Sequence, residues 1–298
     1  MRELAVRSGA NEPQARVEAS PSYAAVLLEQ RPAVLGLLML VLLALFAAFG
    51  PVLTPYEPML TNSPQFLPPG SSEAHWFGTS HLGRDMYAAV SHGGRVSLTV
   101  GFVVALMATA IGVVVGAIAG YVGGRVDDAL MRLTELFLIV PRFFLAVLVV
   151  ALFGRSITNL IVILAILSWP AVARVVRADY LSLRERDYVV AARVVGVPPG
   201  RIVFREILPN AVGPALVVGS LQSSQALLTE ASLAYLGLGD PNLPSWGQLL
   251  IEAQPFLQAA PWLAIIPGFA LTLAVLGFNL LGDGLALAFD PQRRSHAR

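Results

Sequence analysis

The chain is organised around Asp187-Tyr188-Val189-Val190-Ala191-Ala192-Arg193-Val194-Val195-Gly196, a charged stretch with long apolar segments on both sides. Within it, the i, i+3, i+4, i+7 spacing of one helix face is occupied by apolar or small residues: Tyr188, Ala191, Ala192 and Val195. The side facing water is supplied by charged residues in and before the stretch: Arg184, Glu185, Arg186, Asp187 and Arg193. The pattern predicts a short amphipathic helix.

The residues that follow predict how this helix ends. Gly196 is placed to close it in a left-handed conformation, and the Pro-Pro-Gly sequence at 198–200 prevents its continuation. A second short helix is expected from Arg201 to about Leu208, stopped by Pro209. Such a loop, here called the 184–210 loop, suits capture by a soluble partner at a membrane surface. An ordinary interfacial loop is the alternative.

The composition indicates an integral membrane protein. The chain is 56% hydrophobic and 13% charged, with a mean hydropathy of +0.69, whereas a soluble domain is roughly 25% charged. The absence of cysteine excludes disulfides, iron–sulfur clusters and thiol catalysis. All 20 basic residues are arginine, so the lysine of a Walker A phosphate loop cannot be supplied. If the protein works with a subunit that hydrolyses nucleotides, that subunit is another chain.

Six apolar segments are predicted to span the membrane, at 33–53, 96–119, 133–153, 157–173, 212–236 and 262–281. About 20 apolar residues suffice to cross the hydrocarbon core. A signal peptide is the competing interpretation of the first segment, but that segment is longer than a typical signal core and follows a long tail. The second segment carries Gly112 and Gly116, a pair that permits close helix approach. Gly120 to Arg125 is expected to form a turn, and Asp127-Asp128 to cap the next helix.

The third segment is the least regular. Glu135 and Arg142 interrupt it, and Pro141 is expected to kink or restart it. The predicted organisation is therefore a tail at 1–31, a first span with an outer loop at 32–95, a core of five spans at 96–289 that includes the 184–210 loop, and a tail at 290–298.

Arginine positions orient the chain. Six spans place both termini on one side, and that side carries most of the arginines: Arg2, Arg7, Arg16, Arg31, Arg125, Arg132, Arg174, Arg177, Arg184, Arg186, Arg193, Arg201, Arg205, Arg293, Arg294 and Arg298. The other side carries only Arg84, Arg95 and Arg155. The positive-inside rule then predicts that the termini and the 184–210 loop are cytoplasmic.

The fifth span carries polar residues that are costly inside lipid. Gln222, Gln225 and Thr229 share one face, and Glu230 lies close to it. They are interpreted as lining a translocation path, with hydrogen bonding between helices as the alternative; Glu230 can instead be a gate or an anchor for the outer loop. Asn279 and Asp283 in the sixth span allow the same two interpretations. No metal site is predicted, because no neighbouring cysteine or carboxylate cluster completes one with His75 and His81. No basic–aromatic pattern for nucleic acid is present.

Four stretches then occur in a characteristic order. The first stretch is 75–85, followed by Gly94 to Leu98, and its marked residues are Gly78, Thr79, Leu82, Gly83, Arg84 and Asp85. The second is 120–127, together with Met131, Arg132 and Pro141, and the third is the 184–210 loop. The fourth begins at Glu230, passes through Trp246 and Gly247, and continues to Asn279, Asp283 and Pro291. Together they resemble the permease family of binding-protein-dependent ABC importers. The nearest branch is the second (C) type subunit of the dipeptide/oligopeptide/nickel group.

The resemblance implies an all-α integral membrane fold of six transmembrane helices, the type I importer permease fold with a cytoplasmic coupling (EAA) loop. It also implies partners: a second (B-type) permease subunit, two ABC ATPases and an extracytoplasmic solute-binding protein. It implies the plasma membrane of a bacterium or archaeon, and no enzyme activity in this chain.

Within the implied coupling loop, the family motif matches at Ala191, Ala192, Gly196, Leu208 and Pro209. Asp187, Tyr188, Arg193 and Arg201 complete the set of coupling residues. The usual acid before the two alanines is Val190 here, so Asp187 or Glu185 is the candidate to replace it. Ala286 and Leu287 replace a charged pair that is common in the family.

The hypothesis is that a short amphipathic rod, bound in a groove of an ATPase, moves the spans when the ATPase dimer closes. Peptides are the first choice of substrate, with nickel chelates, glutathione or other small solutes as alternatives. A secondary transporter driven by an ion gradient, and a membrane scaffold, are the rival classes. The first would need central intramembrane carboxylates and often an inverted repeat.

Overall fold

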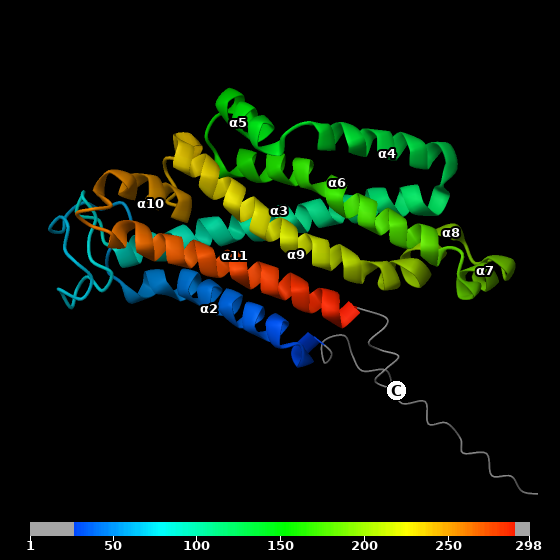
Figure 1. The fold of residues 1–298 in the computed structure, drawn as a ribbon, viewed down its shortest axis with the longest axis horizontal. Coiled ribbons are helices and arrows are strands. Elements are labelled where there is room, and N and C mark those ends of the chain that lie inside the picture. The colour runs from blue at the N-terminus through cyan, green and yellow to red at the C-terminus, as the bar shows by residue number, and fades with distance from the viewer. Residues whose placement is uncertain (1–26, 290–298) are drawn as a thin grey trace, which may run out of the picture.

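The computed structural model describes residues 27–289 as a bundle of long helices (Figure 1). The elements follow in the order α2 (Arg31–Leu53), α3 (Met86–Val122), α4 (Gly124–Ile139), α5 (Arg142–Phe153), α6 (Ile157–Leu183), α7 (Asp187–Val194), α8 (Pro199–Arg201), η1 (Ile202–Ile207), α9 (Leu208–Leu233), η2 (Ala234–Leu238), α10 (Trp246–Ala253), η3 (Gln254–Phe256) and α11 (Trp262–Phe289). The residues at 1–26 and 290–298, predicted to be cytoplasmic tails, lie outside the described residues.

The structure allows the predicted six spans. Five helical stretches are long and apolar enough to cross a membrane, and the bent pair α4–α5 brings the number to six. Several helices are longer than their apolar segments: α3 begins at Met86, α6 continues to Leu183 and α11 to Phe289. Hydropathy marks only the part of a helix that suits lipid, whereas the helix backbone satisfies itself and extends beyond that part.

Pro141 breaks the third span, as predicted. The axes of α4 and α5 differ by 79°. Val140 is extended, with φ −78° and ψ 127°, and Pro141 then precedes the first residue of α5. A proline disfavours the helical conformation of the residue before it, which accounts for the break at this position.

Close packing of α3 against α6 rests on glycine. A Cβ atom on Gly112 would lie 2.5 Å from Cβ of Val172, and one on Gly116 would lie 2.5 Å from the carbonyl oxygen of Ala173. Gly120 continues the same row and faces Tyr180. The expectation that Gly112 and Gly116 permit a close approach is confirmed, because any side chain would push the two helices apart.

The connection between α3 and α4 differs from the prediction in two respects. The turn is confined to Gly123 and Gly124, which have φ of +70° and +56°, and α3 continues through Val122. Asp127 does not cap α4. The N-cap residue is Gly123, which has no side chain, and the start of the helix has no side-chain cap. The Asp127 carboxylate instead accepts two hydrogen bonds from Arg177 on α6, with Nη2–Oδ2 at 2.6 Å. This paired geometry ties α4 to α6.

The prediction that Pro209 stops a second short helix is wrong. The helical stretch runs on from Pro199 to Leu238. A π-helical segment, η1, precedes the proline, and the N–H of Leu208 donates to the carbonyl of Val203, five residues earlier. Pro209 then occupies the first turn of α9. A proline is tolerated there because its missing N–H is not needed, and the wider π turn carries the chain past it.

The two ends of the bundle differ in their structure. Figure 1 shows α7 and α8 at one end, beside the C-terminal end of α6. The irregular segment at 54–85 and the short helix α10 cover the opposite end (Figure 1). Within residues 27–289 the only β pairing is an isolated bridge between Thr79 and Asp85, in this opposite end. The 184–210 loop and the 75–85 motif are therefore at opposite ends.

Candidate functional site

Helix α7 has an inner apolar surface that packs on the bundle. Val189 is fully buried, and Ala192 and Val197 are partly buried beside it. They contact a cluster that includes Val176 and Tyr180 of α6. This surface fixes how the helix sits on the rest of the chain.

The opposite surface of α7 is apolar and exposed. Val194 and Val195 are 82% and 83% exposed, and Val190 and Ala191 are exposed with them. The predicted single apolar face is therefore divided: Ala192 turns inward, whereas Tyr188, Ala191 and Val195 are exposed. In the described chain nothing covers this outer surface, so it is the surface on which a partner could pack.

Gly196 ends α7 as predicted. Its φ of +83° lies in the left-handed region. Its N–H donates to the carbonyl of Arg193, and the N–H of Val197 donates to that of Ala192, both at 3.0 Å. These two bonds form a Schellman motif, which satisfies the last carbonyls of the helix and reverses the chain sharply.

Side-chain contacts hold the 184–210 loop on the bundle. Tyr180 donates to the carbonyl of Val203 at 3.1 Å. Arg184 donates to the carbonyl of Gly120 at 3.0 Å. The loop is thus connected to both α3 and α6, and a displacement of α7 would be transmitted to both helices.

The remaining predicted coupling residues surround α7. Asp187 is exposed in its first turn, where an acidic group favours the positive end of the helix dipole. The Tyr188 hydroxyl accepts a hydrogen bond from Asn210 at 3.5 Å, and partial desolvation of this otherwise exposed side chain raises the pKa of its phenol. Arg201 and Pro209 are exposed, whereas Leu208 is partly buried.

The polar residues of α9 do not share one environment. Gln222 is 5% exposed, and its amide donates to the carbonyl of Ser168 on α6 at 3.1 Å. Gln225 is exposed, and Thr229, partly exposed, donates to the carbonyl of Gln225. Asn279 of α11 is partly buried. Gln222 thus joins helices, while Gln225 and Thr229 face outward from this chain.

Glu230 points toward the end of the bundle that carries α10. It is 1% exposed and accepts a hydrogen bond from Ser97 of α3 at 3.3 Å. The same Ser97 hydroxyl accepts the backbone N–H of Trp246 at 3.2 Å. This geometry fits the interpretation of Glu230 as an anchor for the outer segment better than that of a residue lining a path.

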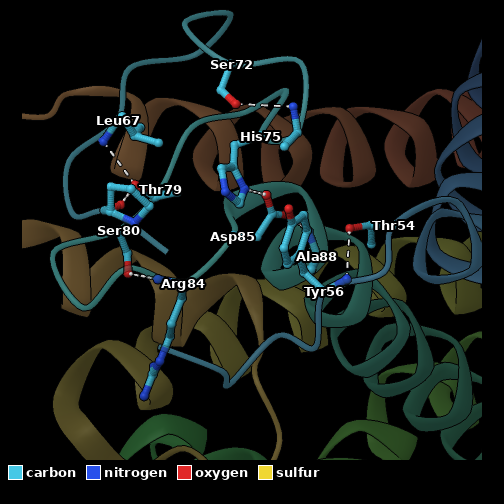
Figure 2. Close-up of polar contacts among 12 residues, drawn as sticks. Thr54, Tyr56, Leu67, Ser72, His75, Thr79, Ser80, Arg84, Asp85 and Ala88 are labelled. Atoms are coloured by element: carbon cyan, nitrogen blue, oxygen red, sulfur yellow. Dashed lines mark hydrogen bonds and ion pairs between the residues drawn. The ribbon is translucent and has the colours of Figure 1, made fainter. Parts of the chain in front are cut away.

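Asp85 organises the end of the bundle opposite α7 (Figure 2). Its carboxylate caps α3 by accepting the N–H of Ala88 at 2.7 Å. The other oxygen lies 2.8 Å from Nδ1 of His75, and both side chains are buried. The motif at 75–85 therefore includes a buried hydrogen bond between His75 and Asp85 that fixes the loop to the start of a spanning helix.

The neighbouring motif residues shape the same loop. Gly78 and Gly83 have φ of +75° and +70°, and a Cβ atom on either would collide with a carbonyl oxygen, that of Leu67 or Ser63. The Thr79 hydroxyl donates to the carbonyl of Pro64 and accepts the N–H of Leu67. These positions need glycine or a small hydrogen-bonding residue for structural reasons.

Contacts between residues far apart in the sequence join the 75–85 motif and the start of α3 to α10. Arg84 pairs with Glu252 of α10 at 3.3 Å, while Leu82 is exposed. Trp246 is fully buried and donates to the carbonyl of Val90 at 2.9 Å. Gly247 packs against the backbone of Ala231, with no room for a side chain. The 75–85 motif and α10 thus form one unit over the ends of the spanning helices.

Two participants in these contacts were not singled out from the sequence. Ser168 and Glu252 each bind a residue far away in the chain. Charge or hydroxyl chemistry alone does not identify such partners, because the spacing between them carries no periodic signal.

Comparison with known proteins shows which family this chain belongs to. Residues 112–295 match the family described as "Binding-protein-dependent transport system inner membrane component". Residues 25–69 match the N-terminal transmembrane domain of oligopeptide transport permease C.

Full-length relatives agree. The chain is 40% identical to a dipeptide transport system permease protein of Alkalihalophilus pseudofirmus, over 88% of this chain and 86% of that protein. It is 37% identical to an oligopeptide transport system permease protein of Bacillus subtilis, with the same two coverages. It is 40% identical to a glutathione transport system permease protein of Pectobacterium atrosepticum, over 90% of this chain and 89% of that protein.

Proposed function

Because this chain belongs to the family of inner membrane components of binding-protein-dependent transport systems, we propose that it is a permease subunit of an ATP-driven importer of peptides. Its six spans supply one half of the translocation path, and a second (B-type) permease subunit supplies the other. An extracytoplasmic binding protein delivers the substrate. The protein resides in the plasma membrane of a bacterium or archaeon, with both termini in the cytoplasm.

Peptides are the proposed substrates because of the names that the relatives carry. Two of the three relatives described are permeases of dipeptide or oligopeptide transport systems, and one belongs to a glutathione transport system. Glutathione is itself a short peptide, so the chemistry shared by these substrates is that of small peptides with free carboxylates. A nickel chelate or another small solute is the alternative.

The energy source is proposed to be a pair of partner ATPases that bind ATP and Mg. The chain has no lysine for a Walker A loop, so hydrolysis falls to other subunits. The ATPases need a surface on this chain through which their closure moves the spans.

The outer surface of α7 is the observation that carries this coupling role. It presents Ala191, Val194 and Val195 away from the bundle, while the inner surface is packed against α6. A helix with apolar residues on both sides can bind a groove of a partner and the bundle at once. The helix is then a rigid connection between ATPase and spans, because Gly196 and Tyr180 fix its position.

The outward-facing polar groups of α9 support the position of the path. Gln225, Thr229 and Ser232 follow at i, i+4 and i+7 on one side of the helix, and each is at least partly exposed. An amide exposed to lipid in the middle of a span is unfavourable, so this side fits a water-filled path shared with the second permease subunit.

The experiment that tests the proposal is uptake by the assembled importer in proteoliposomes. Ala191→Asp places a charge on the outer surface of α7, and uptake of labelled dialanine is expected to fall at least tenfold, while dialanine still binds the external binding protein. Gly200→Asp adds the same charge in the same loop at an exposed position with open space around it, and is expected to leave uptake within twofold. Normal uptake and ATPase stimulation in Ala191→Asp would refute the coupling role.

A further inference from the structure

Arg142 places a positive charge near the middle of a broken span. It is the first residue of α5, directly after the break at Pro141, and the α4–α5 pair runs from Gly124 to Phe153. Gln222 and Ser168 are also near the middle of α9 and α6. These three residues from three spans therefore meet at similar depth, far from both ends of the bundle.

The contacts of Arg142 leave its charge without a counter-ion in the described chain. Its Nη1 atom lies 3.5 Å from Oε1 of Gln222, which is a long and weak hydrogen bond. Among residues 27–289 the arginines that pair with a carboxylate are Arg84, Arg177 and Arg184, and Arg142 is not one of them. The side chain is only partly buried, so an incoming group can reach it.

Gln222 is oriented toward Arg142 by a second bond. Its Nε2 atom donates to the carbonyl of Ser168 at 3.1 Å, which leaves Oε1 to face the guanidinium. Gln222 is 5% exposed, so its orientation is fixed by packing. The amide oxygen of the glutamine thus faces the arginine without neutralising its charge.

The break between α4 and α5 adds a second feature that favours binding of an anion beside Arg142, namely the start of a helix. The first backbone N–H groups of a helix lack partners within it, and they carry the positive end of its dipole. Helix α5 has 12 residues and no side-chain cap at its start, where Arg142 is located. Interrupted membrane helices of transporters point such ends at anionic substrate groups near the midplane.

We propose that Arg142, held beside Gln222 at the α4–α5 break, is a binding point for the terminal carboxylate of a peptide in transit. This inference rests on the proposed function and names the substrate group that the path recognises. A carboxylate loses hydration as it enters the path, and a guanidinium fork can replace water with paired hydrogen bonds. Every linear peptide has this group, so such a point serves peptides of any sequence.

The alternative is that Arg142 pairs with a carboxylate of the second permease subunit. The following experiment distinguishes that ion pair from binding of the peptide carboxylate. Uptake of dialanine and of its C-terminal amide is measured with the complete importer in proteoliposomes, at saturating loaded binding protein. Maximal rates are compared, so that affinity for the binding protein does not enter. Assembly of each variant is followed by co-purification of the subunits.

Arg142→Gln is expected to lower the maximal rate for dialanine about tenfold and that for the amide less than twofold. Arg142→Lys, which keeps the charge, is expected to keep the rate ratio of acid to amide within about threefold of the original. Arg155→Gln is the matched control, because Arg155 binds the carbonyl of Gly237 at the end of the bundle that carries α10. Its rate ratio is expected to stay unchanged.

Equal losses for both peptides in an assembled Arg142→Gln complex would overturn the inference and indicate an ion pair with the partner subunit. If Arg142→Gln does not assemble, Gln222→Leu decides: a lower rate ratio of acid to amide is expected, and an unchanged ratio overturns the inference. An original complex that transports neither peptide would instead refute the proposed function.

Discussion

Arg193 of α7 lies over the ring of Tyr121 at the end of α3, with its guanidinium carbon 5.4 Å from the ring centroid. The contact joins the short helix of the 184–210 loop to a spanning helix that packs along α6, α9 and α2. We propose that this contact forms part of the route by which a movement of α7 reaches the bundle.

Tyr121→Leu removes the face of this ring but keeps an apolar side chain. An exposed cation–π contact contributes about 0.5–1 kcal/mol, so we expect uptake per ATP hydrolysed to fall about two- to fivefold. Tyr121→Phe retains the ring and is expected to behave like the original. The measurement is uptake and ATPase activity of the same proteoliposomes. A normal ratio in Tyr121→Leu would show that this contact transmits no movement.

Gly196→Ala tests whether the Schellman end of α7 sets the geometry of the loop. A Cβ atom there would meet nothing within 4 Å, so the only penalty is the left-handed φ of +83°, about 1–2 kcal/mol for a residue with a side chain. We expect a loss of uptake severalfold greater than the loss of ATPase activity.

Gly200→Ala is the matched control for that variant. It also adds a Cβ atom in open space, but its φ is not in the left-handed region. Uptake within twofold of the original is expected in the same assay. If the two alanine variants behaved alike, the conformation of Gly196 would have no part in coupling.

Gly112→Ala tests the contact of α3 with α6. The new Cβ atom would lie 2.5 Å from Cβ of Val172, which forces the helices apart. We expect a loss of about 1–3 kcal/mol, the usual cost of overpacking, seen as a lower midpoint of thermal unfolding in detergent.

Gly268→Ala on α11 is the comparison for this effect. Its Cβ atom would meet only Leu250 at 3.7 Å, an ordinary contact. Alanine is favoured over glycine in a helix by about 0.5–1 kcal/mol, so the midpoint is expected to stay or rise. An unchanged midpoint in Gly112→Ala would mean that the two helices can separate freely.

Much of the fold is predictable because apolar length and special backbone residues act locally. Six spans follow from the apolar segments, since lipid requires about 20 such residues in each. The break at Pro141 and the left-handed Gly196 follow from the backbone limits of proline and glycine. Gly112 and Gly116 predict a close helix contact, although the sequence does not say that the partner is α6.

The errors arise where one residue has two acceptable structural solutions. Pro209 was expected to stop a helix, but the π turn before it lets the helix continue into α9. Asp127 was expected to cap α4, but Arg177 from α6 offers a stronger, charge-assisted partner. Both outcomes depend on neighbours that sequence spacing does not reveal.

The candidate sites were also predicted in part: the sequence locates the helices that carry them but not the direction in which each side chain points. The amphipathic pattern predicts α7, but it does not say which apolar residues pack inward. Ala192 lies inside and Ala191 outside, because the bundle provides a surface only on the side of Val189. The polar positions of α9 appear equivalent on a helical wheel, yet Gln222 meets Ser168 while Gln225 meets nothing comparable.

The central claim is that the outer surface of α7 binds an ATPase in the cytoplasm. The chain has no cysteine, so Val195→Cys introduces a single reactive site at a position that is 83% exposed. The measurement is labelling by a membrane-impermeant maleimide, in intact spheroplasts and in inverted vesicles, with and without the ATPase subunits. We predict labelling only in inverted vesicles, and protection of Val195→Cys from the maleimide when the ATPases are present. Labelling from outside intact spheroplasts, or labelling in inverted vesicles that the ATPases do not affect, would contradict it.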